Sequence, residues 1–232
     1  MGLLMFCLNY ILAYRAQIYI TSALSAVAFS AMLWMNILNA RIFFGVRVGL
    51  RVYLGALLGM TGIVVLFGPQ VSEVSLSDSV VIGSLLALLG AFMASFGNMA
   101  SQAAQQEKLP VIQSNAWSML YGCLFTAAVA IIQGHKFAFD TSPGYVISLI
   151  YLTVFGSVIA FGAYLTLLGR IGAHRAGYAT VMFPVVALIL STLFEGLALG
   201  WSVFLGFGLV LGGNLLVLTQ NRRKPAVPPP VS

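Results

Sequence analysis

The chain has 232 residues, of which 60% are hydrophobic and only 7% are charged, and its formal net charge is +6. Soluble domains carry about 25% charged residues, so this composition excludes a water-soluble enzyme, a disordered protein and a nucleic-acid binder. The remaining class is an integral membrane protein, whose first partner is the lipid bilayer. Cys7 and Cys123 lie within apolar runs and are interpreted as packing residues, not as a disulfide or a metal site.

Apolar runs of bilayer-spanning length follow one another along the chain, since a spanning helix needs about 20 mostly apolar residues. Short polar, Gly or Pro breaks separate them. Gly68-Pro69 is expected to stop the third span, and Pro110 and Pro143 are expected to open later ones. The predicted fold is all-α with about eight transmembrane helices. The predicted spans are 2–20, 22–44, 51–68, 79–104, 110–134, 143–170, 175–196 and 201–219.

The basic residues predict the orientation, because Lys and Arg are retained on the cytoplasmic side of a membrane. With an even number of spans, both termini share one side. Placing them in the cytoplasm leaves only Arg15 and Lys136 in the outer segments. The inner segments then hold Arg41, Arg47, Arg51, Lys108, Arg170, Arg175, Arg222, Arg223 and Lys224.

An internal repeat relates two distant parts of the chain. Residues 43–62 align without gaps to residues 194–213, with identical residues that include four glycines. Gly45, Gly49, Gly55 and Gly62 fall on Gly196, Gly200, Gly206 and Gly213. The two copies would cross the membrane in opposite directions, which is the inverted repeat typical of secondary transporters.

The sequence motifs of both copies resemble those of a known family. Pro184 to Ala187, Leu193 to Gly196 and Gly212-Gly213 resemble the end of an EamA domain, as Asn9-Tyr10 and Asn39 to Arg41 resemble the first copy. The resemblance is to the drug/metabolite transporter superfamily and covers nearly the whole chain. Members with two EamA domains have ten helices, so this chain would begin at the third helix of the first repeat.

This resemblance implies an incomplete inverted repeat of three plus five helices. The expected parts are a partial first repeat (1–70), an external linker (71–78), a second repeat (79–220) and a disordered, Pro-rich cytoplasmic tail (221–232). It also implies a bacterial inner membrane as the location.

The function expected from these features is secondary transport of small organic metabolites or drug-like solutes, in the export direction. The alternative is a non-transporting membrane protein, either a truncated remnant or a subunit of a larger assembly. An enzyme is not expected, because no clustered His, Cys, Asp or Glu set is present. No nucleotide or metal motif occurs, so no cofactor, metal or nucleic-acid partner is predicted.

Polar side chains inside the bilayer are costly and are the candidates for a substrate cavity. Neutral amides and phenols suit an amphipathic solute, although each could instead join two helices by a hydrogen bond. The candidates are Asn9, Tyr10, Asn36, Asn98, Tyr164 and Asn214.

Two further residues are candidates for roles in the transport mechanism, and the glycines for a role in helix packing. Pro184, in the middle of the seventh span, is a hinge candidate or a static kink. Glu195 is a coupling candidate or an interfacial residue that faces water. The glycine-rich faces predict close helix packing within the fold, with a homodimer interface as the alternative.

Overall fold

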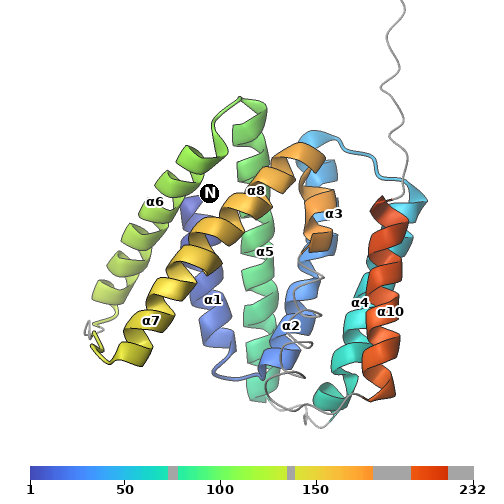
Figure 1. The fold of residues 1–232 in the computed structure, drawn as a ribbon, viewed down its shortest axis with the longest axis horizontal. Helices are drawn as coiled ribbons and strands as arrows, with labels where there is room; N and C mark the ends of the chain where they lie inside the picture. Colours follow the sequence, from blue (N-terminus) through green and yellow to red (C-terminus); the bar gives the residue numbers. More distant parts are fainter. Residues whose placement is uncertain (73–77, 135–138, 180–199, 219–232) are drawn as a thin grey trace, which may run out of the picture.

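The structure is a computed structural model that describes residues 1–72, 78–134, 139–179 and 200–218. Within these residues every regular element is a helix (Figure 1). The helices are η1 (Gly2–Leu8), α1 (Asn9–Ala16), α2 (Ser22–Ser30), α3 (Met32–Phe44), α4 (Leu50–Ser72), α5 (Asp78–Gln106), α6 (Val111–Ile132), α7 (Pro143–Tyr151), η2 (Leu152–Ile159), α8 (Ala160–Ile171) and α10 (Trp201–Leu218). Residues 173–179 are also helical.

The helices follow the predicted spans. Each span from 2–20 to 143–170 coincides with one helix or a run of consecutive helices, with a one-residue break at Ala31 in the span 22–44, and α10 coincides with 201–219. Most of the span 175–196 and the whole tail 221–232 lie outside the described residues. Four helical stretches are long and apolar enough to cross a membrane, and shorter apolar helices accompany them. The four stretches are Val27–Phe44, Asp78–Gln106, Val111–Ile132 and Pro143–Ile171.

Local sequence signals explain where several helices begin and end. The Thr21 hydroxyl accepts a hydrogen bond from the backbone N–H of Leu24 and caps α2. Gly45 follows α3 with φ of 63°, a left-handed conformation that glycine adopts without strain. Pro143 occupies the first turn of α7, as predicted. The expected stop at Gly68-Pro69 is wrong, because α4 continues to Ser72. Proline removes a single backbone donor near the end of α4, which a transmembrane helix tolerates.

Helix α5 is the central element of the bundle. It packs against η1, α1, α2, α3 and α8, while α4 and α10 form a pair at one edge. Helices α6 and α7 lie at the opposite edge (Figure 1). Helix α5 therefore contacts most of the other described helices, whereas α4 meets the bundle through α2.

The α4–α10 pair is built on the repeated glycines. A Cβ placed on Gly62 would lie 2.7 Å from the carbonyl oxygen of Gly206, and one placed on Gly213 would lie 2.6 Å from that of Gly55. The two backbones therefore approach each other at a distance that only glycine permits. Gly208 and Gly212 meet nothing within 4 Å, so they do not belong to this seam.

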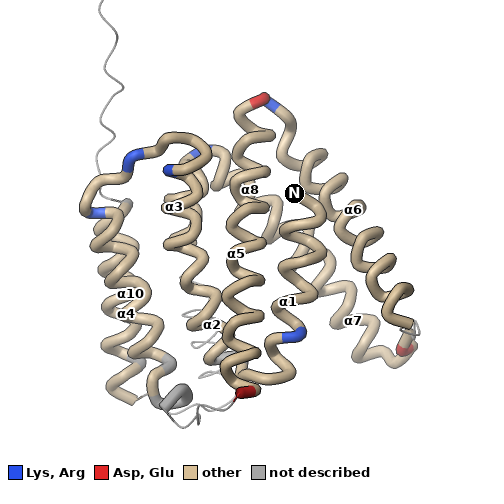
Figure 2. The backbone as a smooth tube through the Cα atoms, turned by 180° about the vertical axis from the view of Figure 1, so that it is seen from behind, with Lys and Arg blue, Asp and Glu red and all other residues tan. Residues whose placement is uncertain are grey.

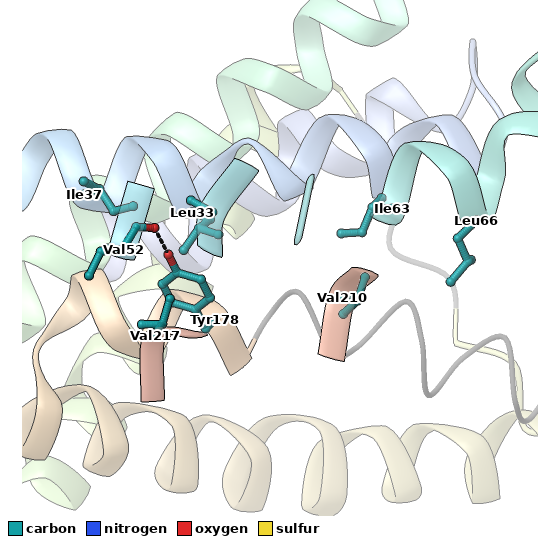
Figure 3. Packing of buried hydrophobic residues seen from close by; sticks show 9 residues of the cluster. Leu33, Ile37, Val52, Ile63, Leu66, Tyr178, Val210 and Val217 are labelled. Carbon is teal, nitrogen blue, oxygen red and sulfur yellow. Dashed lines mark hydrogen bonds between the residues drawn. The ribbon is translucent and has the colours of Figure 1, made fainter. Parts of the chain in front are cut away.

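An apolar cluster extends from this seam to α3. Val52, Ile63 and Leu66 of α4 pack with Val210 and Val217 of α10, and Leu33 and Ile37 of α3 join them. Tyr178 lies in the same cluster and donates its hydroxyl proton to the carbonyl of Val52 (Figure 3). The cluster attaches the α4–α10 pair to the rest of the bundle by burying apolar side chains.

Charged residues gather at the two ends of the bundle, and one end is rich in Lys and Arg (Figure 2). This end contains the α3–α4 connection with Arg47, the α5–α6 turn with Lys108, and the last turn of α8 with Arg170. Asp78 and Asp140 lie where α5 and α7 begin, at the opposite end. The structure thus places these basic residues at one common end of the bundle, and that this end faces the cytoplasm stays a prediction.

We expect Gly213→Ala to destabilise the protein by about 1–3 kcal/mol, because the added methyl group meets the backbone of α4. Gly212→Ala is the matched control, since the same methyl group next to it meets nothing within 4 Å. Unfolding of both variants in mixed micelles measures the difference. Equal free energies of unfolding for the two variants would contradict the close approach of α4 and α10.

The orientation predicts opposite labelling of two engineered cysteines in a Cys7→Ala/Cys123→Ala background. A membrane-impermeant maleimide added to intact cells should label Thr141→Cys, which precedes α7. Lys108→Cys, in the α5–α6 turn, should react only after the cells are permeabilised. Labelling of both cysteines in intact cells would show that the predicted topology is wrong.

Candidate functional site

A row of polar side chains follows one face of α5 toward the basic end of the bundle. The spacing of three or four residues places them on one side of the helix. All are buried or half-buried, and several form hydrogen bonds to neighbouring helices. The row consists of Ser95, Asn98, Ser101, Gln102 and Gln105.

Asn98 joins three helices at one point. Its Nδ2 donates to Oδ1 of Asn36 in α3 at 3.3 Å and to the hydroxyl oxygen of Tyr164 in α8 at 3.0 Å. Asn36 and Asn98 are almost completely buried. Each of the three lies seven or eight residues before the end of its helix, roughly 12 Å at the rise of an α-helix. The structure thus brings together Asn36, Asn98 and Tyr164, which we call the polar cluster.

Further bonds from the same face of α5 surround the polar cluster. Ser95 accepts from Nδ2 of Asn39 at 2.9 Å. Gln102 accepts from the backbone N–H of Ala173 at 2.7 Å, and Gln105 donates to the carbonyl of Leu165 at 3.0 Å. These bonds hold α3, α8 and the start of helix 173–179 against α5, so the cluster is positioned by its neighbours on both sides.

The polar cluster has unused hydrogen-bonding capacity. Nδ2 of Asn36 and Oδ1 of Asn98 are both buried, and neither has a partner among the described residues. An unpartnered buried polar atom costs about 1–3 kcal/mol, so such atoms mark places where water or a ligand completes the bonding. One free donor and one free acceptor therefore lie within the same cluster.

The hydrogen-bond partners in and around the polar cluster are uncharged. Its bonds come from amides, a phenol, hydroxyls and backbone groups. Beyond α8, burial and then the nearby charge of Arg175 lower the pKa of His174 to about 4, so this imidazole is neutral at physiological pH. The arrangement can recognise a solute by hydrogen bonds and shape, without an ion pair from the described residues.

The other predicted site residues lie apart from this bonding. Asn9 donates to the carbonyl of Met5 and Asn214 donates to that of Val210, in each case within four residues along the chain. The ring of Tyr10 lies 6.1 Å from that of Tyr14. The bonds of Asn9 and Asn214 thus stay within one helical run, although Oδ1 of Asn9 is also buried without a partner among the described residues.

Pro184 and Glu195 lie outside the described residues, so the hinge and coupling roles stay predictions. Sequence reasoning did not single out Asn39, Gln102 or Gln105, which support the polar cluster. The signal that could have found the last two is the spacing of polar residues from 95 to 105, which continues the face of Asn98.

Comparisons with known proteins find similarity to membrane transporters. The model of the EamA-like transporter family matches residues 81–219. "Uncharacterized inner membrane transporter YedA" of Escherichia coli (strain K12) is 27% identical over 210 residues, covering 90% of this chain and 66% of the relative. "Uncharacterized transporter YoaV" of Bacillus subtilis (strain 168) is 24% identical over 217 residues, covering 92% of this chain and 72% of the relative.

A third relative is the "Probable amino-acid metabolite efflux pump" of Escherichia coli (strain K12), 25% identical over 213 residues, covering 89% of this chain and 70% of the relative. The chain spans about two thirds of the length of YedA. A solved structure described as "Crystal structure of protein" superposes with a TM-score of 0.78 at 19% identity, over 90% of this chain and 71% of that one, which shows a shared fold. With its family match, its apolar helices and its repeated glycine seam, the chain belongs to the EamA-like transporter family.

Proposed function

We propose that this membrane transporter is a secondary carrier that exports small organic metabolites across a bacterial inner membrane, and that the polar cluster is part of its substrate site. The location rests on the name of YedA as an inner membrane transporter, and the direction on the relative named as a probable efflux pump. The observation that carries the proposal is the unpartnered donor of Asn36 beside the unpartnered acceptor of Asn98.

The chemistry of the polar cluster narrows the class of solute. A ligand that bonds to both free atoms must carry a hydrogen-bond acceptor and a donor close together, as amide, amino-acid and hydroxy-acid groups do. The apolar side chain of Met32 also contacts Asn98, through its sulfur at 4.0 Å. A thioether packs adaptably against apolar groups, so a solute with a polar head and an apolar part fits the cluster best.

Transport by purified protein tests the proposal. In proteoliposomes loaded with a panel of amino-acid metabolites, counterflow of at least one member should be saturable. Asn36→Ala should lower its rate about tenfold, the effect of losing one buried hydrogen bond to the solute.

Asn214→Ala is the matched control for this experiment. It removes another buried amide, whose described bond stays within α10, and should leave the transport rate within about twofold of wild type. All proteins are first checked for equal insertion and monodispersity. Equal rates for the two alanine variants would exclude the polar cluster as the substrate site, and no counterflow of any panel member would contradict the transport proposal.

The proposal also requires the three side chains of the polar cluster to act as one unit. A double-mutant cycle of Asn98→Ala and Tyr164→Phe should give a coupling free energy of about 0.6 kcal/mol, the average for bonds between membrane helices. The control cycle pairs Asn98→Ala with Asn214→Ala and should be additive within about 0.3–0.5 kcal/mol. Unfolding in mixed micelles supplies all the free energies. Additivity in both cycles would mean that the bond between Asn98 and Tyr164 contributes nothing.

A further inference from the structure

A groove between α6 and α8 lies apart from the polar cluster. Its volume is about 670 Å³, and its walls come from α6, α8 and the end of η2. Small residues leave the space open: Ala116 on α6, and Gly162 and Ala163 on α8. A Cβ placed on Gly162 would meet no atom within 4 Å, which confirms that the groove is empty above this residue.

The two ends of the groove differ in chemistry. At the basic end of the bundle, Arg170 and Asn115 line it. Farther in, the lining is apolar and includes Met119, Val158 and Ile159. From Arg170 to Val158 the groove extends about 18 Å at the rise of a helix. It is thus a long apolar slot with a cation at its mouth.

Two more polar side chains line the groove: the Thr166 hydroxyl donates to the carbonyl of Gly162, whereas Asn115 has an atom without a partner. The Asn115 side chain is only 6% exposed, and its Oδ1 has no hydrogen-bond donor among the described residues. The Arg170 side chain is exposed and forms no ion pair with any described residue. A ligand that suits this mouth carries an anion for Arg170 and a hydrogen-bond donor for Asn115.

The position of the groove indicates where such a ligand comes from. Ile112, which lines the groove, and Trp117, next to Ala116 on α6, are exposed and apolar or aromatic, as is typical of a surface covered by lipid. Its mouth lies at the basic end of the bundle, the level at which a cytoplasmic leaflet presents phosphate groups. Basic pockets between helices on that side are known to bind phospholipid headgroups.

We infer that the α6–α8 groove binds one phospholipid of the cytoplasmic leaflet, with its phosphate on Arg170, a headgroup hydroxyl or ammonium on Asn115, and an acyl chain along the apolar slot. A second copy of this chain fits less well, because it offers only five acidic residues against eleven basic ones as partners for Arg170. The inference does not depend on the proposed function.

Photolabelling tests the site. The protein is placed in nanodiscs that contain phosphatidylglycerol with a diazirine on the acyl chain, and the adducts are mapped by mass spectrometry. We expect adducts concentrated at 116–119 and 158–163. Phosphatidylcholine with the same diazirine lacks a headgroup donor and should label these segments several-fold less, the effect of one hydrogen bond.

Two pairs of variants make the result specific. Gly162→Leu fills the groove and should lower labelling there about tenfold, whereas Gly156→Leu, on the same helical run but outside the groove, should not. Arg170→Gln should lower phosphatidylglycerol labelling about tenfold by removing a charge-assisted bond. Arg47→Gln removes an equal charge from the α3–α4 connection and should leave labelling unchanged.

Three results would overturn the inference. The first is an even spread of adducts over the exposed faces of α6 and α7. The second is equal labelling of wild type and Gly162→Leu, with both proteins monodisperse and melting at the same temperature. The third is a covalent dimer formed through Ala163→Cys in the cysteine-free background, which would place a second copy in the groove.

Discussion

The structure depends on how polar groups are satisfied where no water is available. Hydrocarbon offers no hydrogen-bond partner, so each backbone group is paired within its own helix and each polar side chain needs a partner on its own helix or on a neighbouring one. Helix α5 carries more buried polar side chains than any other described helix, and their partners come from α3, α8 and the start of helix 173–179. The polar face of α5 therefore determines which helices lie next to it and at what depth.

Two different kinds of contact hold the bundle together. The α4–α10 pair is apolar and close, because glycine lets the backbones approach and dispersion then acts over many atoms. The contacts of α5 at the basic end are polar, and two atoms of the polar cluster remain unpartnered. Apolar packing has no preferred partner outside the protein, whereas a free donor and a free acceptor do. The polar cluster on α5 therefore keeps unused hydrogen-bonding capacity, whereas the α4–α10 pair is held by apolar packing alone.

Much of this architecture could be predicted from the sequence. The helices follow from runs of apolar residues between Gly and Pro breaks, and the glycine seam follows from the repeat. Asn36, Asn98 and Tyr164 were singled out as polar residues within predicted spans, but the sequence cannot show which faces of three helices meet. Gln102 and Gln105 were passed over because they lie near the end of a span, where polar residues are ordinary. The extension of α4 past Pro69 was missed because a soluble-helix rule was applied to a membrane helix.

The seam between α4 and α10 also bears on how the two copies of the repeat can diverge. Gly55 corresponds to Gly206 and Gly62 to Gly213 in the alignment, while in space Gly55 meets Gly213 and Gly62 meets Gly206. The contact is therefore isologous: each copy presents the same patch to the other, as in a two-fold symmetric dimer. A larger residue at any of these four positions meets the backbone of the opposite copy, where no side chain can be trimmed to accommodate it. A substitution of these glycines in one copy alone would clash with the backbone of the other copy. The two copies must therefore keep glycine at these positions, while their sequences can differ at positions outside the seam.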